Sequence, residues 1–326
     1  PWLTKQHSLL ANKFASVQLH QGTNIGFGAG HNHNLALAHT PFFWVTNVDL
    51  EFEPGTLTTL LHAAEQDVEQ FKTHGGAQVA AWECRQKPYE HPKDYHPVSG
   101  ETSWCSSACV LFKTDAIKAV NCYEPLLFLY GEDVELSYRL RDHGFKLKYV
   151  PKATVWHFTY EEAAQIKPQQ FLGSTLANVL LRCRYGRRHE VIQGFVMFVA
   201  LFAMKPLFEG MRTKLLGQSL KLLKLAPQFL RTRRQKLVVA KVASHSPNSR
   251  SACSWSEFWP VLLCPVSWAH VTMHTMMKHR GRSQLFLTRQ RSFIKIRETS
   301  QTPRQHNVET RRLWLQIFKN LNQASM

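Results

Sequence analysis

The first 160 residues alternate short apolar runs with longer stretches of mixed polarity. Residues 42–46 form an aromatic and β-branched run without polar alternation, which is typical of a parallel strand buried on both faces. Residues 79–82 predict a second strand. Between them, residues 56–70 predict a helix with one apolar face, made by Leu57, Leu60, Leu61 and Ala64. This order of strand, helix and strand predicts an α/β sheet.

The α/β pattern continues after an interruption. Residues 83–103 carry three prolines and a glycine among polar residues, which predicts a long loop. Residues 108–112 then predict a strand, and residues 132–143 predict a helix with acidic residues in its first turn. A further strand is expected over residues 147–150, where Pro151 ends it, before the chain reaches His157.

The pattern changes after residue 159. Helical apolar runs extend from about residue 171 to residue 242. The longest of them, at 191–204, is shorter than the about 20 apolar residues that span a membrane, so we expect a buried or interfacial helix. Residues 243–254 are rich in Ser, Pro and Asn and predict a linker. We therefore expect a domain over 1–160, a basic helical region over 161–242, and a linker and C-terminal segment without an assigned role over 243–326.

Charge is distributed unevenly along the chain, whose net charge is +17. Residues 1–160 hold 13 Lys and Arg against 16 Asp and Glu, whereas residues 161–326 hold 27 against 7. The two halves are therefore expected to differ in function. A hydrophobic content of 44% excludes disorder throughout. The seven cysteines show neither C-x-x-C pairing nor a zinc pattern, which indicates reduced thiols in a cytosolic compartment.

Three segments of the first half carry candidate chemistry. Asp49 follows a predicted strand, where a carboxylate can hold a divalent cation, although Asp is also a common turn residue. Residues 24–32 include three glycines in five residues and suit either a tight turn or a phosphate cradle before a helix that starts at Asn32. Glu132 and Asp133 begin a predicted helix, either as caps that compensate its dipole or as a general base.

The order of these segments resembles glycosyltransferase family 2, the inverting enzymes that use nucleotide sugars and have the GT-A fold. Residues 24–32 resemble the family's Asn-x-Gly-Phe-x-x-Gly-x-Asn segment, and residues 47–49 resemble its D-x-D equivalent. Residues 130–139 resemble its Tyr-x-Glu-Asp-x-Glu-Leu-x-x-Arg signature, and a Tyr-Val-Pro-x-Ala-x-Val-x-His strand ends at His157. Within the family, the likeness is greatest to rhamnosyltransferase-like members of bacterial polysaccharide synthesis.

The resemblance implies an α/β fold of the GT-A type, in which helices flank a mostly parallel sheet and the basic helical region follows. It also implies that a first strand–helix unit is missing, with residues 15–19 as its remnant. Asp49 and His157 would hold Mg²⁺ or Mn²⁺ on the donor diphosphate. Asp133 would be the catalytic base, and Glu132 would position it or bind acceptor hydroxyls.

The same resemblance implies a donor site and a reaction. The donor would be bound by Asn24, Gly26, Gly28, Gly30, Asn32, Asn47 and Asp49. Trp104 precedes a central strand, where it suits stacking on an acceptor sugar and equally a core position. The expected function is inverting transfer of a sugar from a nucleotide-diphosphate donor to a glycan or lipid-linked acceptor in bacterial cell-surface polysaccharide synthesis. The alternative is a catalytically inactive remnant that serves as a structural or interaction module.

The basic half predicts a helix at a charged surface. Leucines between residues 215 and 225 alternate with lysines, and a basic cluster follows that comprises Arg231, Arg233, Arg234 and Lys236. This pattern suits an anionic membrane, with nucleic-acid binding and a solvated helical face as alternatives. The nearby apolar run and the absence of a nucleic-acid-binding motif favour the membrane. We therefore expect a cytoplasmic protein, peripheral at the inner face of the cell membrane, without a nucleic acid partner.

Overall fold

The computed structural model describes residues 22–88, 93–158 and 167–233, all of which belong to one compact unit. The predictions for residues 15–19, for Arg234 and Lys236, and for the region 243–326 lie outside the described residues.

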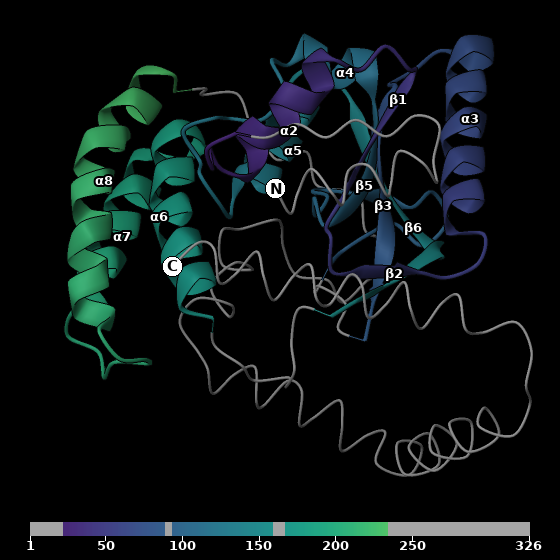
Figure 1. Cartoon of the computed structure of the whole chain (residues 1–326). Helices are drawn as coiled ribbons and strands as arrows, with labels where there is room; N and C mark the ends of the chain where they lie inside the picture. The colour runs from purple at the N-terminus through teal and green to yellow at the C-terminus, as the bar shows by residue number, and fades with distance from the viewer. Residues whose placement is uncertain (1–21, 89–92, 159–166, 234–326) are drawn as a thin grey trace, which may run out of the picture. The chain divides into compact units, whose positions relative to one another are not determined.

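The centre of the described chain is a mixed six-stranded sheet (Figure 1). Its strand order is β1-β5-β3-β6-β2, and β4 pairs with β6. The strands are β1 (Phe42–Thr46), β2 (Leu50–Phe52), β3 (Val79–Lys87), β4 (Glu101–Thr102), β5 (Cys109–Lys113) and β6 (Lys146–His157).

The expectation of a mostly parallel sheet is wrong. Among the described strands only β3 and β6 pair in parallel, whereas β5 runs antiparallel to both of its neighbours. β2 and β4 are likewise antiparallel to β6. The apolar pattern of a strand reports burial and not direction, so the strand at 108–112 looked in sequence like those at 42–46 and 79–82.

β1 is less buried than its apolar run predicts. Only Val45 is fully buried, and the other four residues of the strand keep partial exposure. In the described part of the sheet β1 stands at the end of the strand order, with β5 as its hydrogen-bonded neighbour.

Two strands are longer than expected. β3 continues to Lys87, so the predicted loop at 83–103 starts later and contains β4. β6 passes through Pro151, because a register shift against β3 between Cys84 and Arg85 takes up the extra residues. Both strands therefore reach the sheet end that carries Gln86 and His157.

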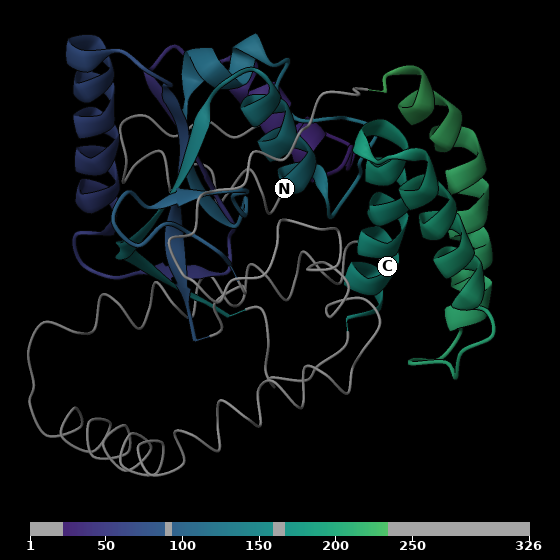
Figure 2. The same ribbon diagram turned by 180° about the vertical axis from the view of Figure 1, so that it is seen from behind.

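Helices cover both faces of the sheet (Figures 1 and 2). α3 (Thr56–His74) packs on the face where Leu111 points, while α2 (Phe27–Ala36), α4 (Thr114–Ala119) and α5 (Glu132–Asp142) pack on the face of Val110 and Phe112. Alternate residues of β5 thus belong to two cores, as the pleat of a strand requires.

The buried face of α3 is narrower than predicted. It runs along Thr56, Leu60 and Ala64, one residue in four, and Leu61 is partly buried beside it. Leu57, which was expected on this face, is exposed because it lies to one side of that row.

Three helices follow the sheet domain and lie side by side in both views (Figures 1 and 2). They are α6 (Pro168–Tyr185), α7 (Arg188–Ala200) and α8 (Met211–Arg231). Their shared core includes Leu180 of α6, Phe198 of α7 and Leu215 of α8. Within the described ranges, we find no helix with the length and apolarity that crossing a membrane needs.

Candidate active site

Asn47, Asp49 and His157 come together at one end of the sheet. Asn47 follows β1, Asp49 precedes β2, and His157 is the last residue of β6, opposite Leu50 of β2. His157 Nε2 lies 3.3 Å from Asp49 Oδ1 and 3.5 Å from Asn47 Nδ2. Antiparallel pairing of β2 with β6 therefore brings together residues that are more than 100 positions apart.

Gln86 selects the tautomer of His157. The Gln86 carboxamide oxygen lies 2.7 Å from His157 Nδ1, and because this oxygen can only accept, Nδ1 carries the proton and donates it. In the neutral ring, Nε2 then has a lone pair directed at the Asp49 carboxylate. Two acceptors at this distance fit a shared cation, and a histidine held by its second nitrogen is typical of metal ligands.

Two protein ligands suit a cation that also binds substrate. No group of three or more His, Cys, Asp or Glu side chains that could hold a metal is found among residues 22–88, 93–158 and 167–233. Magnesium-type ions are commonly held by one or two protein side chains, with substrate phosphates and water as the other ligands. Asp49 and His157 fit that kind of site.

Glu132 and Asp133 occupy the first turn of α5. Gly131 precedes them with φ 89°, and a Cβ there would lie 2.4 Å from Cβ of Ala177 in α6. Only glycine therefore allows α6 to pack this closely against the start of α5. Asp133 is partly exposed and its carboxylate accepts the N–H of Val134 at 2.8 Å.

The two adjacent acids differ in their surroundings. Glu132 is 5% exposed, and its Oε2 has no hydrogen-bond partner in the described part of the chain. Burial, with a contribution from the charge of Asp133, raises the pKa of Glu132 to about 8. Burial also raises the pKa of Asp133, but hydrogen bonds from the Val134 and Ser107 N–H groups and the charge of Lys93 oppose that rise. Asp133 is thus the carboxyl of the pair with more groups that stabilise its ionised form.

One short segment connects both clusters. The N–H of Asn47 donates to the carbonyl oxygen of Ala108 at 2.8 Å. The N–H of the neighbouring Ser107 is near enough to the Asp133 carboxylate to lower the pKa of Asp133. The candidate cation ligands and the candidate base therefore flank the residues that enter β5.

Residues 17–174 match the sequence profile of the family described as "Glycosyltransferase like family 2". The chain belongs to glycosyltransferase family 2. Two relatives of this family 2 protein are named N-acetylglucosaminyl-diphospho-decaprenol L-rhamnosyltransferase and come from Mycobacterium tuberculosis, strains CDC 1551 / Oshkosh and ATCC 25618 / H37Rv. Each is 26% identical over 175 residues, covering 42% of this chain. The chain spans 56% of the length of these relatives.

Three solved structures are similar to this chain, each with a TM-score below 0.5. The mannosyltransferase PcManGT from Pyrobaculum calidifontis, in complex with GDP-Man and Mn²⁺, is 11% identical with a TM-score of 0.39, covering 71% of this chain and 74% of its own. GalNAc-T7 with UDP, GalNAc and Mn²⁺ is 11% identical with a TM-score of 0.46, covering 74% and 49%. TarS from S. aureus with UDP-GlcNAc is 13% identical with a TM-score of 0.40, covering 70% and 71%.

The glycine-rich segment of this family 2 protein is part of a helix. α2 starts at Phe27 and not at Asn32, so Gly28, Gly30 and Asn32 lie inside it, and Gly26 caps it. The N–H of Gly26 bonds to Asn24 Oδ1 at 3.1 Å. The prediction that the helix starts at Asn32 is therefore wrong, because the first turn of α2 already contains Gly28 and Gly30.

α2 is held by the turn that precedes α5. The Asn32 carboxamide makes two hydrogen bonds of 2.8 Å with the backbone of Tyr123, one to its carbonyl oxygen and one from its N–H. A Cβ at Gly28 would lie 2.8 Å from Cβ of Tyr123, and one at Gly26 would lie 2.6 Å from the Phe128 carbonyl oxygen. These contacts give Gly26, Gly28 and Asn32 packing roles. A Cβ added at Gly30, in contrast, would have no atom within 4 Å.

Trp104 packs against Lys93 and against hydrophobic neighbours. The Lys93 ammonium lies 4.1 Å from the ring centre and donates to the Trp104 carbonyl oxygen at 2.8 Å. The ring also packs beside Val134 and Tyr185.

Sequence reasoning missed three polar residues of the site. Glu83 and Gln86 were assigned to a loop that in fact begins after β3, and Lys93 stood among other polar residues without a motif. No alternation of polar and apolar residues marks the continuation of β3, since Arg85, Gln86 and Lys87 are all polar, so periodicity gave no signal for it.

A buried charged cluster joins α6 to α5. Glu135 of α5 is fully buried and accepts from Arg139 at 2.7 Å, from Arg184 at 2.7 Å and from the Tyr185 hydroxyl at 2.7 Å. Arg184 also bonds to Glu124 at 2.6 Å. The helix that carries Glu132 and Asp133 is thus fixed by charges from the first helix of the second half.

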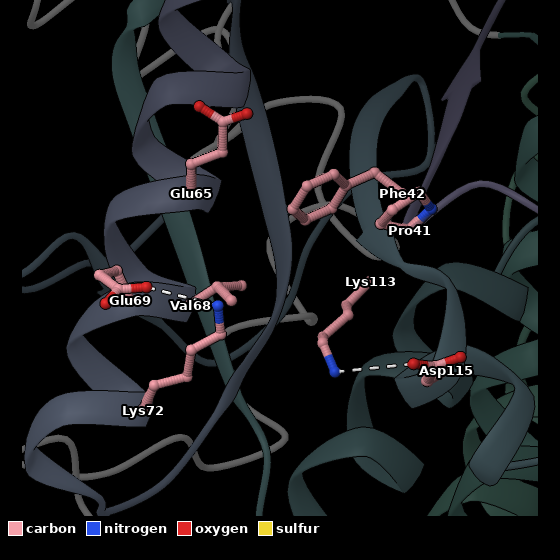
Figure 3. A pocket seen from close by; sticks show the side chains of 8 residues that line it. All are labelled: Pro41, Phe42, Glu65, Val68, Glu69, Lys72, Lys113 and Asp115. Atoms are coloured by element: carbon pink, nitrogen blue, oxygen red, sulfur yellow. Dashed lines mark hydrogen bonds and ion pairs between the residues drawn. The ribbon is translucent and has the colours of Figure 1, made fainter.

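A pocket of about 270 Å³ lies away from these residues, between α3 and the ends of β1 and β5 (Figure 3). Two ion pairs occupy its walls, Lys72 with Glu69 at 3.4 Å and Lys113 with Asp115 at 3.9 Å. None of the predicted site residues lines it. The lining residues are Pro41, Phe42, Glu65, Val68, Glu69, Lys72, Lys113 and Asp115.

Proposed function

We propose that this protein is an inverting glycosyltransferase that moves a sugar from a nucleotide-diphosphate donor to a hydroxyl of a glycan or lipid-linked acceptor. The observation that carries the proposal is the segment 107–108: Ala108 accepts the N–H of Asn47 at 2.8 Å, and the Ser107 N–H is near enough to the Asp133 carboxylate to lower its pKa. A reaction of this type needs a site for the donor diphosphate beside a base for the acceptor. Two such groups at one sheet end meet that need.

Asp133 is the proposed base. It takes the proton of the acceptor hydroxyl as the hydroxyl oxygen bonds to the anomeric carbon, and the bond from that carbon to the diphosphate breaks. The nucleoside diphosphate leaves with the bonding electrons, and the anomeric configuration inverts. Glu132, buried with a raised pKa, remains protonated at neutral pH and is proposed to bind an acceptor oxygen through its carboxyl proton.

Asp49 and His157 are the proposed ligands of Mg²⁺ or Mn²⁺. A bound cation would supply positive charge opposite the leaving diphosphate. Asn47 directs its amide at the same place, and Gln86 keeps the ring of His157 in the tautomer that binds a cation. Asn24, Gly26, Gly28, Gly30 and Asn32 remain proposed donor-binding residues, and Gly26, Gly28 and Asn32 also pack against Tyr123 and Phe128.

The donor and acceptor are proposed from the curated relatives. Their name specifies L-rhamnose as the sugar and N-acetylglucosaminyl-diphospho-decaprenol as the acceptor. We therefore propose rhamnosyl transfer to an N-acetylglucosaminyl diphospho-prenol in bacterial cell-surface polysaccharide synthesis. Trp104, whose ring packs against Lys93, stays a proposed acceptor contact.

Transfer of labelled sugar into the lipid phase tests the activity. Full-length protein is incubated with Mn²⁺, N-acetylglucosaminyl-diphospho-decaprenol and nucleotide-diphosphate L-rhamnose, with other nucleotide sugars in parallel. Asp133→Asn should reduce transfer by about 10²–10⁴-fold, since it removes the base and keeps its shape. Asp115→Asn, at an exposed carboxylate outside the site, should leave transfer unchanged. Transfer by Asp133→Asn within a few-fold of wild type would make Asp133 only a helix cap, and no transfer with any donor would favour the inactive module.

Calorimetry of nucleoside diphosphate binding tests the cation ligands. Wild type should bind more tightly with Mn²⁺ than without it, whereas Asp49→Ala should show the same weak affinity in both conditions. The fold should survive, because Asp49 is one-third exposed and not part of a core. Equal Mn²⁺-dependence in the variant and in wild type would remove Asp49 from the site.

We further propose that α8 lies on an anionic membrane surface at the cytoplasmic side. Its exposed leucines, Leu216, Leu220 and Leu223, lie on one face of the helix at i, i+4 and i+7. The helix carries five Lys and Arg and no acid, and Lys224 and Arg231 border that face. α7 exposes a similar row, Ile192, Val196 and Val199. Apolar side chains with a basic border are typical of helices that lie in a membrane interface.

Vesicle sedimentation tests this second proposal independently of catalysis. Vesicles with anionic lipid should bind the protein, and Lys221→Gln/Lys224→Gln should weaken binding by about 1 kcal/mol per residue at low salt. Leu220→Ser/Leu223→Ser should weaken it at all salt concentrations, because apolar burial is not screened. Val98→Ser, an exposed apolar residue outside these helices, is the control. Salt-sensitive binding to RNA without any binding to vesicles would contradict the membrane assignment.

A further inference from the structure

Lys93 and Glu83 form an ion pair that is almost fully removed from solvent. Their side chains are 3% and 2% exposed, and the Lys93 ammonium donates to the Glu83 carboxylate. A buried ion pair rarely stabilises a fold more than apolar side chains of the same size, because both charges must be desolvated. The position of the pair is better explained by the groups that it orients.

The pair holds both ends of a three-residue segment. Lys93 donates to the carbonyl oxygen of Trp104 at 2.8 Å, and Glu83 accepts the N–H of Ser106 at 3.0 Å. The middle residue, Cys105, is fully buried between them. The backbone that leads to Ser107 is therefore fixed by one cation and one anion.

The same segment is tied to the start of α5. Ser137 Oγ accepts the N–H of Cys105 at 3.1 Å and donates to the carbonyl oxygen of Asp133 at 2.7 Å. The N–H of Ser107, the next residue but one, is near enough to the Asp133 carboxylate to lower its pKa. A displacement of the segment would therefore disturb both the Ser137 link to Asp133 and a group that favours its ionised form.

Asp133 also faces several titratable groups from the elements around it. Glu132 lies on its own helix, Glu83 comes from β3, and Cys105 and Tyr123 come from the segments on either side. The two acids disfavour an ionised Asp133, and both the thiol and the phenol stay neutral because burial raises their pKa. Lys93 is a cation whose charge acts on Asp133 in the opposite sense.

We propose that Lys93 is a positioning residue for Asp133. Paired with Glu83, it holds the segment 104–106, which Ser137 ties to the backbone of Asp133, and it places a cation near a carboxylate that two other acids surround. This inference rests on Asp133 being the base of the proposed reaction. Its structural part, the coupling of Lys93 to Asp133, holds whatever the substrate is.

A double-mutant cycle of stability tests the coupling without any substrate. Urea denaturation is followed at pH 8 for wild type, Lys93→Met, Asp133→Asn and the double variant. If Lys93 stabilises ionised Asp133, Lys93→Met should lower the denaturation midpoint less in the Asp133→Asn background than in wild type. Where Lys93→Met does not fold, Lys93→Met/Glu83→Gln, which removes both charges, replaces it in the cycle. Additive midpoint shifts overturn the proposal.

The pH profile of transfer tests the role in catalysis. The acidic limb of kcat/KM reports the pKa of the base in the free enzyme. Loss of Lys93 raises that pKa, so the limb should move to higher pH in Lys93→Met and return toward wild type in Lys93→Arg. Lys118→Met, at an exposed lysine, should leave it in place. If Lys93→Met is active and the acidic limb of its kcat/KM profile does not move, the proposal is overturned. If the denaturation midpoints are non-additive but the protein transfers no sugar, only the proposed function is overturned.

Discussion

Removal of Arg184 should destabilise the protein far more than removal of an exposed cation. Arg184 is 5% exposed and neutralises two carboxylates, Glu135 at 2.7 Å and Glu124 at 2.6 Å. It also bonds to Thr232 at 3.1 Å and lies 4.0 Å from the ring centre of Phe229. Arg184→Met would leave those carboxylates close together in a site that excludes water.

The expected loss follows from these contacts. Breaking a buried ion pair by removing one partner costs about 3–5 kcal/mol. The lower end, about 3 kcal/mol, is expected because Arg139 stays on Glu135 at 2.7 Å and because Met can pack against Phe229. For a unit of this size, that loss corresponds to a decrease in Tm of roughly 6–12 °C. Arg184→Met/Glu124→Gln should recover part of it, since one carboxylate loses its charge.

Urea denaturation monitored by circular dichroism measures this difference. The matched control is Lys72→Met, whose ion pair with Glu69 is 66% and 70% exposed and should matter by no more than about 0.5 kcal/mol. If Arg184→Met is as stable as Lys72→Met, then α6 does not depend on Glu135 for its attachment to α5. A double variant less stable than Arg184→Met would also refute the electrostatic explanation.

Two further predictions concern pH and packing. Because burial raises the pKa of Glu132 to about 8, the folded protein holds a proton there that the unfolded chain releases near its ordinary value of 4.5. As pH rises from about 4.5 to about 8, the free energy of unfolding of wild type should therefore decrease relative to that of Glu132→Gln. Urea denaturation at pH 5, 6.5 and 8 measures this difference, and the exposed Glu65→Gln is the control, for which no change with pH is expected. A difference between wild type and Glu132→Gln that does not change with pH would show that Glu132 is ionised in the fold. In α2, Gly28→Ala should destabilise the protein by about 1–3 kcal/mol, because the added Cβ would lie 2.8 Å from Cβ of Tyr123. Gly30→Ala should stabilise the protein by about 0.5–1 kcal/mol, because a Cβ at that position would have no atom within 4 Å. Equal thermal shifts for both alanine variants would mean that α2 does not pack on Tyr123 in this way.

The local pattern of the sequence was sufficient for the elements that carry the main acids. Asp49 was expected just past a strand, Glu132 and Asp133 in the first turn of a helix, and His157 after a strand, and the structure has them there. Each of these positions depends on residues close by in sequence, such as an apolar run before Asp49 and a glycine before Glu132. Hydrophobic periodicity and turn residues report on such short distances.

Strand direction was decided by tertiary structure alone. β5 has the same apolar character as β1 and β3, yet it runs against both. The direction of a strand follows from the path of the connection before it, and the residues between β3 and β5 carry no periodic pattern from which that path could be read. The sequence therefore determined an α/β sheet but not its mixed pairing.

The polar contacts of the site were likewise decided by the fold. Gln86 bonds to His157 across 71 positions, and Arg184 bonds to Glu135 across 49. Lys93 looked like a solvated residue of a polar loop, but it is buried against Glu83 and Trp104. A charged side chain has the same sequence signature on a surface and in a buried pair, because only packing by distant residues removes it from water. The sequence by itself thus determined the candidate chemical groups and the local element that carries each of them, and the tertiary structure determined which side chains hold those groups in place.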